Sequence, residues 1–160
     1  MLSLFAILLI VVPVLIHLLL TKKTRNTENI IEIILFWWIC VSMSVSGFIA
    51  FYGHIFMADK IAASIGWPTG NPFQAEVAVA NLAFAILAFL SFWFRENFWV
   101  ATAVGQSSFL LGAAVIHINE AISKGNFAIN NVGPILFIYD LLLPIILLAL
   151  VFAYKKIKGF

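Results

Sequence analysis

The chain has 160 residues, of which 64% are hydrophobic and 10% are charged, and its mean hydropathy is +1.10. A soluble domain is about half apolar and about a quarter charged, so a core of this length cannot enclose the excess and lipid must cover it. The net charge of +2 provides no basic surface suited to nucleic acid, which excludes nucleic-acid binding. The single cysteine, Cys40, lies in an apolar run and cannot form an internal disulfide, so we expect a buried, inert thiol.

Five apolar stretches follow one another, each close to the roughly 20 residues that a helix needs to cross a bilayer. They predict an all-α, polytopic transmembrane bundle that forms one integral membrane domain over residues 1–160. The helices are expected at about residues 2–20, 30–57, 73–94, 98–120 and 134–155. The first stretch has its basic cluster after the apolar run and lacks a cleavage site, so we interpret it as a retained, peripheral helix that could serve oligomer contacts.

Capping patterns mark the starts of two of these helices. Asn29, with Glu32 three residues later, has the spacing of a capping box at the start of the second helix. Asn71 followed by Pro72 and Gln74 predicts a capped start for the third helix.

The basic residues divide unevenly between the two sides of the predicted bundle. If every stretch crosses once, two basic residues, Lys60 and Lys124, fall on one side. The other seven fall together on the opposite side: Lys22, Lys23, Arg25, Arg95, Lys155, Lys156 and Lys158. Since cytoplasmic loops carry the excess of Lys and Arg, we expect an external N-terminus and a cytoplasmic C-terminus in a multi-pass protein of a prokaryotic cell (inner) membrane.

A group of polar side chains is predicted to collect at the outer end of the bundle. Its members are His54, Glu76, Asn81, Gln106, His117, Glu120 and Asp140. Ionisable groups in a bilayer are costly, so such a cluster is a site hypothesis by default. His117 and Glu120 are spaced i, i+3 and share a helix face with Gln106. This polar face should point into the bundle, because lipid cannot form hydrogen bonds with it. Asp59 is expected at the surface.

Three interpretations of this group stay open. A metal or cofactor site would use His117, Glu120, Glu76 and Asp140, since helical bundles build metal centres from such side chains. A proton or small-ligand site would pair a histidine with a carboxylate. A structural polar network would only fix the packing of the helices. The sequence contains no phosphate loop, nucleophile elbow or C-x-x-C motif, so whether the protein is an enzyme stays open.

The bilayer is the expected partner, together with further copies of the chain or a larger membrane complex. The alternatives to a ligand-binding role are a non-enzymatic subunit or scaffold and a small oligomeric transporter. A transporter is less favoured because the chain shows no obvious pair of broken-helix repeats.

Several short stretches resemble the signature of a small, uncharacterised family of prokaryotic integral membrane proteins. They are the run from Gly53 to Lys60, Ile65 to Pro68, Pro72 to Val77, Ala80 to Leu82, Leu110 to Ala113, His117, Gly125 to Phe127, Gly133-Pro134 and Asp140. The resemblance covers about residues 47 to 145 and implies no catalytic role, because that family's activity is not known.

Gly53, Lys60, the Gly66-Trp67-Pro68 loop and Glu76 also show a more distant similarity to DoxX-like membrane proteins. That similarity implies a four-helix bundle and, in some relatives, a link to thiol or quinone redox chemistry. The chain departs from that pattern through its additional leading helix and its single intramembrane cysteine.

Overall fold

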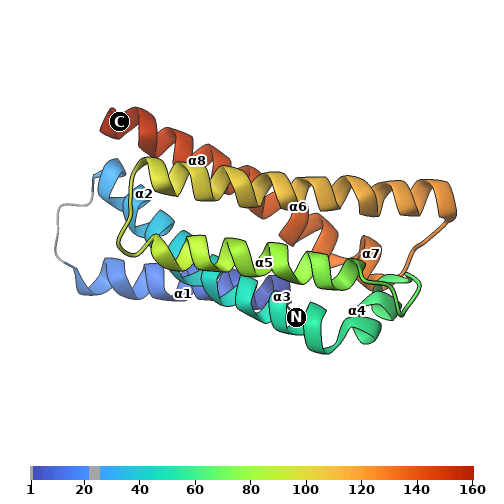
Figure 1. Cartoon of the computed structure of the whole chain (residues 1–160). Helices are drawn as coiled ribbons and strands as arrows, with labels where there is room; N and C mark the ends of the chain where they lie inside the picture. Colours follow the sequence, from blue (N-terminus) through green and yellow to red (C-terminus); the bar gives the residue numbers. More distant parts are fainter. Residues whose placement is uncertain (1, 22–25) are drawn as a thin grey trace.

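The computed structural model of the chain describes residues 2–21 and 26–160, and this part of the chain is all-helical. The helices are α1 (Leu2–Leu20), α2 (Thr27–Leu35), η1 (Phe36–Met43), α3 (Ser44–Phe56), α4 (Ala58–Ile65), α5 (Phe73–Leu90), α6 (Asn97–Lys124), α7 (Ile129–Val132), η2 (Ile135–Leu142) and α8 (Leu143–Lys158). Consecutive elements join into long rods that run side by side (Figure 1). Within the described residues, five helices are long and apolar enough to cross a membrane, and they span Ser3–Leu20, Thr27–Phe56, Phe73–Leu90, Asn97–Lys124 and Ile129–Lys158.

The helix ends differ from the expected positions for local reasons. The second long helix begins at Thr27 rather than residue 30, because Asn26 is the cap and its side chain accepts a hydrogen bond from the backbone N–H of Asn29. Asn71 does cap the next start, since its Oδ1 accepts from the N–H of Phe73 at 3.1 Å. Helix α5 ends at Leu90, four residues before the expected end at Phe94, and the Ser91 hydroxyl donates to the Leu87 carbonyl there.

Two π-helical segments, η1 and η2, interrupt the second and the last long helices. Segment η2 ends just before Pro144, which lies in the first turn of α8 and has no N–H to donate to a carbonyl of the preceding turn. At the end of η1, the hydroxyl of Ser44, the first residue of α3, donates to the carbonyl of Cys40 in η1 at 2.8 Å. Such segments are rare and often lie at functional sites.

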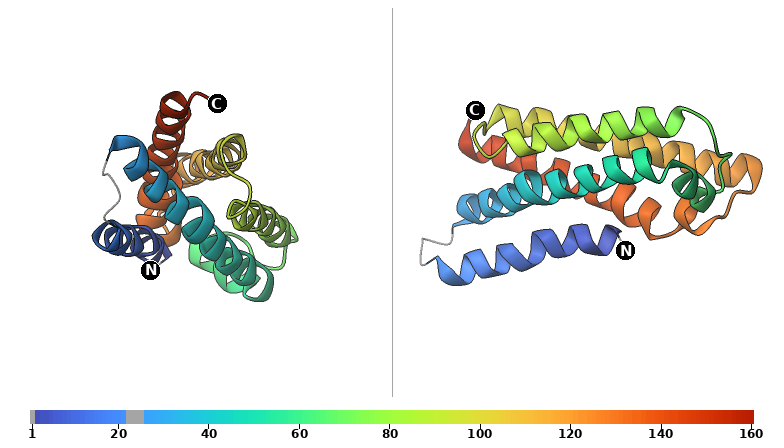
Figure 2. Two further views of the ribbon diagram at one scale, coloured as in Figure 1. Left: turned by 90° about the vertical axis from the view of Figure 1, so that its left-hand side faces the viewer. Right: turned by 60° about the horizontal axis from the view of Figure 1, so that its bottom comes forward.

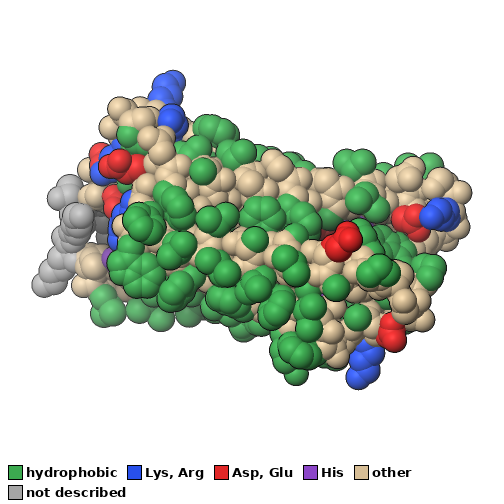
Figure 3. Space-filling model, in the orientation of Figure 1, with side chains coloured by type: hydrophobic (Ala, Val, Ile, Leu, Met, Phe, Trp, Pro, Cys, Tyr) green, Lys and Arg blue, Asp and Glu red, His purple; other side chains and the backbone are tan. Residues whose placement is uncertain are grey.

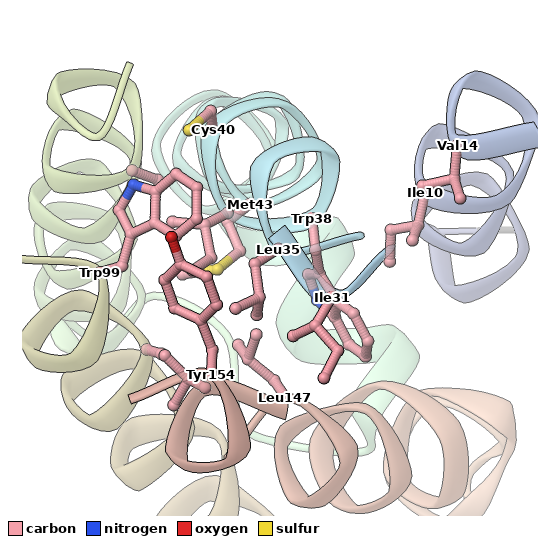
Figure 4. Close-up of a cluster of buried hydrophobic side chains, with 14 residues drawn as sticks. Ile10, Val14, Ile31, Leu35, Trp38, Cys40, Met43, Trp99, Leu147 and Tyr154 are labelled. Atoms are coloured by element: carbon pink, nitrogen blue, oxygen red, sulfur yellow. The ribbon is translucent and has the colours of Figure 1, made fainter. Parts of the chain in front are cut away.

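A cluster of buried hydrophobic side chains lies toward the end of the bundle where α2 and α8 meet. Figure 4 shows the rings of Trp99 and Tyr154 beside each other, with Leu35 nearby and Ile10 reaching across from α1. Trp99 is fully buried, and its indole N–H donates to the Ser91 carbonyl at 2.9 Å. This cluster therefore joins α1, α2, α6 and α8 at one end of the molecule.

Helix α1 lies at one side of the bundle, against α2, η1 and η2 (Figure 2). Ser42 donates a hydrogen bond to the Ala6 carbonyl, and the indole N–H of Trp37 donates to Nδ1 of His17. Helices α3 and α5 approach each other closely at Gly47, where an added Cβ would lie 2.9 Å from the Cβ of Ala85. That close approach requires glycine at position 47.

On the face shown in Figure 3, most charged side chains lie toward the two ends, and many hydrophobic side chains lie on the surface between them. At the α2/α8 end, Arg95 pairs with Glu32 at 3.2 Å, and Lys158 pairs with Glu28 at 2.7 Å. The guanidinium of Arg95 also lies 5.4 Å from the ring centroid of Trp99. The three basic residues expected beside them, Lys22, Lys23 and Arg25, lie outside the described residues.

Candidate functional site

A cavity of about 830 Å³ lies toward the end of the bundle where α4 and α7 are placed. Helices α3 and α5 form one wall, and α6 with η2 forms the opposite wall. The cavity exists because α3 packs on α5 while α6 packs on η2 and α8, and the two groups touch less closely. Tyr52 and Glu76 line it and are exposed, so it opens to the surface.

The cavity brings together five of the seven polar residues predicted to cluster. They are His54, Glu76, Asn81, His117 and Asp140. Its volume falls within the range of about 300–1,000 Å³ that is usual for small-molecule sites. Most of the remaining wall is apolar, with Ile49, Val77, Leu110, Ile116 and Ile135 among the contributing side chains.

Asp140 is the most buried acid of this wall, with 4% of its surface exposed. It lies on η2, and its carboxylate has no hydrogen-bond or ion-pair partner within residues 2–21 and 26–160. A buried carboxylate without a partner is unfavourable, and such groups are normally paired. Asp140 is therefore the side chain of the cavity that most needs a further partner.

His117 is held in a defined orientation by Asn131. The amide nitrogen of Asn131 donates to the carbonyls of His117 and Asn126, at 3.2 and 2.7 Å. Its Oδ1 therefore accepts from Nδ1 of His117, at 2.7 Å. The other ring nitrogen of His117, Nε2, has no partner among the described residues. Trp67 stacks on the imidazole, with ring centroids 5.4 Å apart and planes 16° from parallel.

A hydrogen bond joins the last residue of α4 to the loop after α6 at this end of the cavity. Asn126 donates from its amide to the Ile65 carbonyl at 2.9 Å. Gly66 follows with a φ of +82°, in the left-handed region that favours glycine, and a Cβ there would lie 2.5 Å from Oδ1 of Asn126. This contact positions Trp67 over His117.

Two further polar side chains on the wall bond to neighbouring groups. His54 Nδ1 and Gln74 Oε1 are 2.6 Å apart, which ties the end of α3 to the start of α5. Asn81 donates to the Val77 carbonyl at 2.8 Å, and its side-chain oxygen has no partner in the described part of the chain. Glu76 is exposed at the mouth.

Gln106 and Glu120 lie away from the large cavity. Gln106 lines a separate cavity of about 20 Å³, which has room for about one water molecule. Its Oε1 and the Ser46 hydroxyl are buried there with no hydrogen-bond partner in the described structure. Glu120 pairs with Lys124 at 2.6 Å, one helical turn further along α6. Asp59 is exposed, as expected, and accepts a hydrogen bond from the N–H of Gly70.

The described residues contain no group of three or more His, Cys, Asp or Glu side chains placed to hold a metal ion. The set of His117, Glu120, Glu76 and Asp140 is therefore not gathered around one point. What the arrangement offers instead is an apolar chamber with one unpaired carboxylate and a fixed imidazole.

Three contributors to this end of the molecule were not among the predicted site residues. They are Trp67, Asn131 and Asn126, which come from loops or from the four-residue helix α7. Trp67 and Asn126 belong to the short stretches that carry the family resemblance, but nothing in their local pattern indicates contact with His117.

The fold and the cavity define an all-helical protein with five candidate membrane-crossing helices and a chamber at one end. The chain belongs to a family of unknown function (DUF6790), whose pattern matches residues 1–159. No significant match is found among curated proteins or among solved structures.

Proposed function

We propose that the chain is a multi-pass membrane protein that binds a small amphipathic molecule in the cavity between α5 and α6. The observation that carries the proposal is a chamber of about 830 Å³ with apolar walls and a buried, unpartnered Asp140. Cavities of this kind, with a few convergent polar groups, are where ligands bind in helical bundles.

Small residues create the space on the side of α6 and α5. Gly112 and Ala113 on α6 and Ala80 on α5 line the cavity, and a Cβ on Gly112 would meet nothing within 4 Å. A glycine inside a helix lowers its stability by about 1 kcal/mol relative to alanine, and no close helix contact at Gly112 accounts for that cost. Unlike Gly47, Gly112 is not used for helix packing.

Gly112→Leu tests the proposal, because the new side chain would occupy the cavity without displacing a packed neighbour. The protein would be purified into lipid nanodiscs, and its bound organic molecules identified by extraction and mass spectrometry. We expect wild type to retain a molecule enriched over the nanodisc lipid, and Gly112→Leu to lose it. Ala101→Leu adds the same side chain at an exposed position of α6 outside the cavity and should retain it. Identical extracts from all three proteins would contradict the proposal.

We also propose that the N-terminus is extracytoplasmic, in a prokaryotic cell membrane. Support comes from Arg95, Lys155, Lys156 and Lys158, which belong to the α2/α8 end, because basic residues favour the cytoplasmic side. The cavity would then open near the outer surface. Thr69 is exposed at the opposite end, so Thr69→Cys should react with an impermeant thiol reagent applied to intact cells. Labelling only after lysis would reverse the orientation.

A redox role like that of some DoxX-like proteins has less support. Cys40 is fully buried in the hydrophobic cluster at the other end of the molecule and does not line the cavity. A thiol at that place is inaccessible to a partner dithiol. The binding proposal therefore does not involve the cysteine.

A further inference from the structure

We propose that the molecule in the cavity is a lipophilic organic cation whose positive charge lies against Asp140. The inference rests on the proposed binding function and specifies its ligand class. It follows from the charges, the ring systems and the unpaired group that line the cavity.

The charge of the wall opposes an anionic ligand. Asp140 and Glu76 line the cavity, and within the described residues no Lys or Arg does. The nearest basic residue along α6, Lys124, pairs with Glu120 outside the cavity. A phosphate or carboxylate head group would therefore meet two acids and no fixed cation, whereas complementary charge sets which ligand is admitted.

Aromatic side chains line the same cavity. Tyr52, Trp67, Phe73, Phe109 and Tyr139 line the cavity, from α3, the α4–α5 loop, α5, α6 and η2. Tyr139 is adjacent to Asp140 in the chain, and both line the cavity from η2. Aromatic faces attract organic cations, and rings around one charge are a common way to bind quaternary ammonium groups.

The carboxylate of Asp140 provides a negative charge that a bound cation would pair with. It is 4% exposed and has no partner among the described side chains, so a cation in the cavity would provide the charge that the protein does not. A buried charge without an opposite charge beside it is strongly destabilising, and a bound cation would compensate it. The competing arrangement is a neutral ligand that accepts a hydrogen bond from protonated Asp140. A site of that kind would not bind a cation more tightly than a neutral molecule of the same shape.

Three probes of matched shape separate these cases: tetraphenylphosphonium (cation), tetraphenylmethane (neutral) and tetraphenylborate (anion). Saturable binding of each radiolabelled probe would be measured on nanodiscs with the protein, after subtraction of empty nanodiscs. We expect the cation to bind at least about tenfold more tightly than the neutral probe, and the anion not to bind. Asp140→Asn, which keeps the side-chain shape, should remove this preference.

Glu120→Gln is the matched control, since it makes the same change outside the cavity and should leave the preference intact. If Asp140→Asn fails to fold, Gly112→Leu replaces it, and it should abolish saturable binding of the cation without touching Asp140.

Equal binding of cation and neutral probe, or a preference unchanged in Asp140→Asn, would overturn the inference and leave the proposed cavity function standing. Absence of saturable binding of the cation also overturns it. If the neutral probe then binds wild type but not Gly112→Leu, the binding function survives. If no probe binds and the extracts of Gly112→Leu match wild type, the proposed binding function and the cationic ligand class are both rejected.

Discussion

At the scale of single residues, Asn131 connects His117, which lines the cavity, to the loop after α6. It is fully buried on the four-residue helix α7, and its amide contacts three acceptors or donors on two other segments. Two backbone carbonyls and the His117 ring depend on it. Since each would be left unpaired in a buried place, the loss of Asn131 is more than the loss of one hydrogen bond.

Asn131→Ala should therefore destabilise the protein by about 2–3 kcal/mol, because buried polar groups left without partners are costly. Thermal unfolding in a mild detergent, followed by circular dichroism, would measure the change. Asn119→Ala removes the same amide from an exposed position of α6 and should shift the midpoint very little. A midpoint for Asn131→Ala equal to that of Asn119→Ala would show that α7 does not hold His117.

The ionisable residues that line the cavity are easier to single out in the sequence than the groups that contact them. His54, Glu76, His117 and Asp140 stand out because charge is rare in apolar helices, and each lines the cavity. Asn131 and Trp67 lie in polar or turn-rich segments, where such residues are ordinary. Helical spacing groups Glu120 with His117, but in the structure the Glu120 carboxylate pairs with Lys124 one turn away, and spacing alone does not distinguish the two.

At the scale of elements, hydropathy predicts the number of long helices but not how each is wound. The stretches expected to cross a membrane are those that the structure builds as helices, because apolar length is read directly from the sequence. The π-helical segments were not expected. Segment η2 ends just before Pro144, a residue that can be seen in the sequence. Segment η1 has no proline beside it; it includes the buried residues Cys40 and Ser42, which contact other helices.

The contact between α3 and α5 can be tested with two glycines of α3. Gly47→Ala would bring a Cβ to 2.9 Å from that of Ala85, so we expect a loss of about 1–3 kcal/mol from overpacking. Gly53→Ala meets only the Ile61 side chain, at 3.8 Å, and should be neutral or stabilising because alanine favours the helix. Unfolding of both variants in mixed micelles with increasing denaturing detergent would rank them. Greater stability of Gly47→Ala than of Gly53→Ala would contradict the close packing.

At the scale of the whole molecule, the two ends are built differently. The α2/α8 end has the main hydrophobic cluster and a network in which Arg95 pairs with Glu32 while lying over the rings of Phe36 and Trp99. The α4/α7 end has the large cavity, its unpaired Asp140 and its exposed mouth. A chamber at one end is compatible with a stable fold because the helices are joined firmly at the other.

The same substitution at two tryptophans tests this difference. Trp99 is fully buried and donates to the Ser91 carbonyl, so Trp99→Phe leaves that carbonyl unpaired and a void beside Tyr154. We expect it to lower stability by about 2–3 kcal/mol.

The indole N–H of Trp67 has no partner in the described structure, so Trp67→Phe loses no hydrogen bond and retains part of the stacking on His117. We expect a change below about 1 kcal/mol, with altered probe binding, because the ring lines the cavity. Thermal unfolding and probe binding, measured on both variants, separate the two roles. If Trp67→Phe were the more destabilising, stability would depend on the cavity end, and the division into a firm end and a binding end would be wrong.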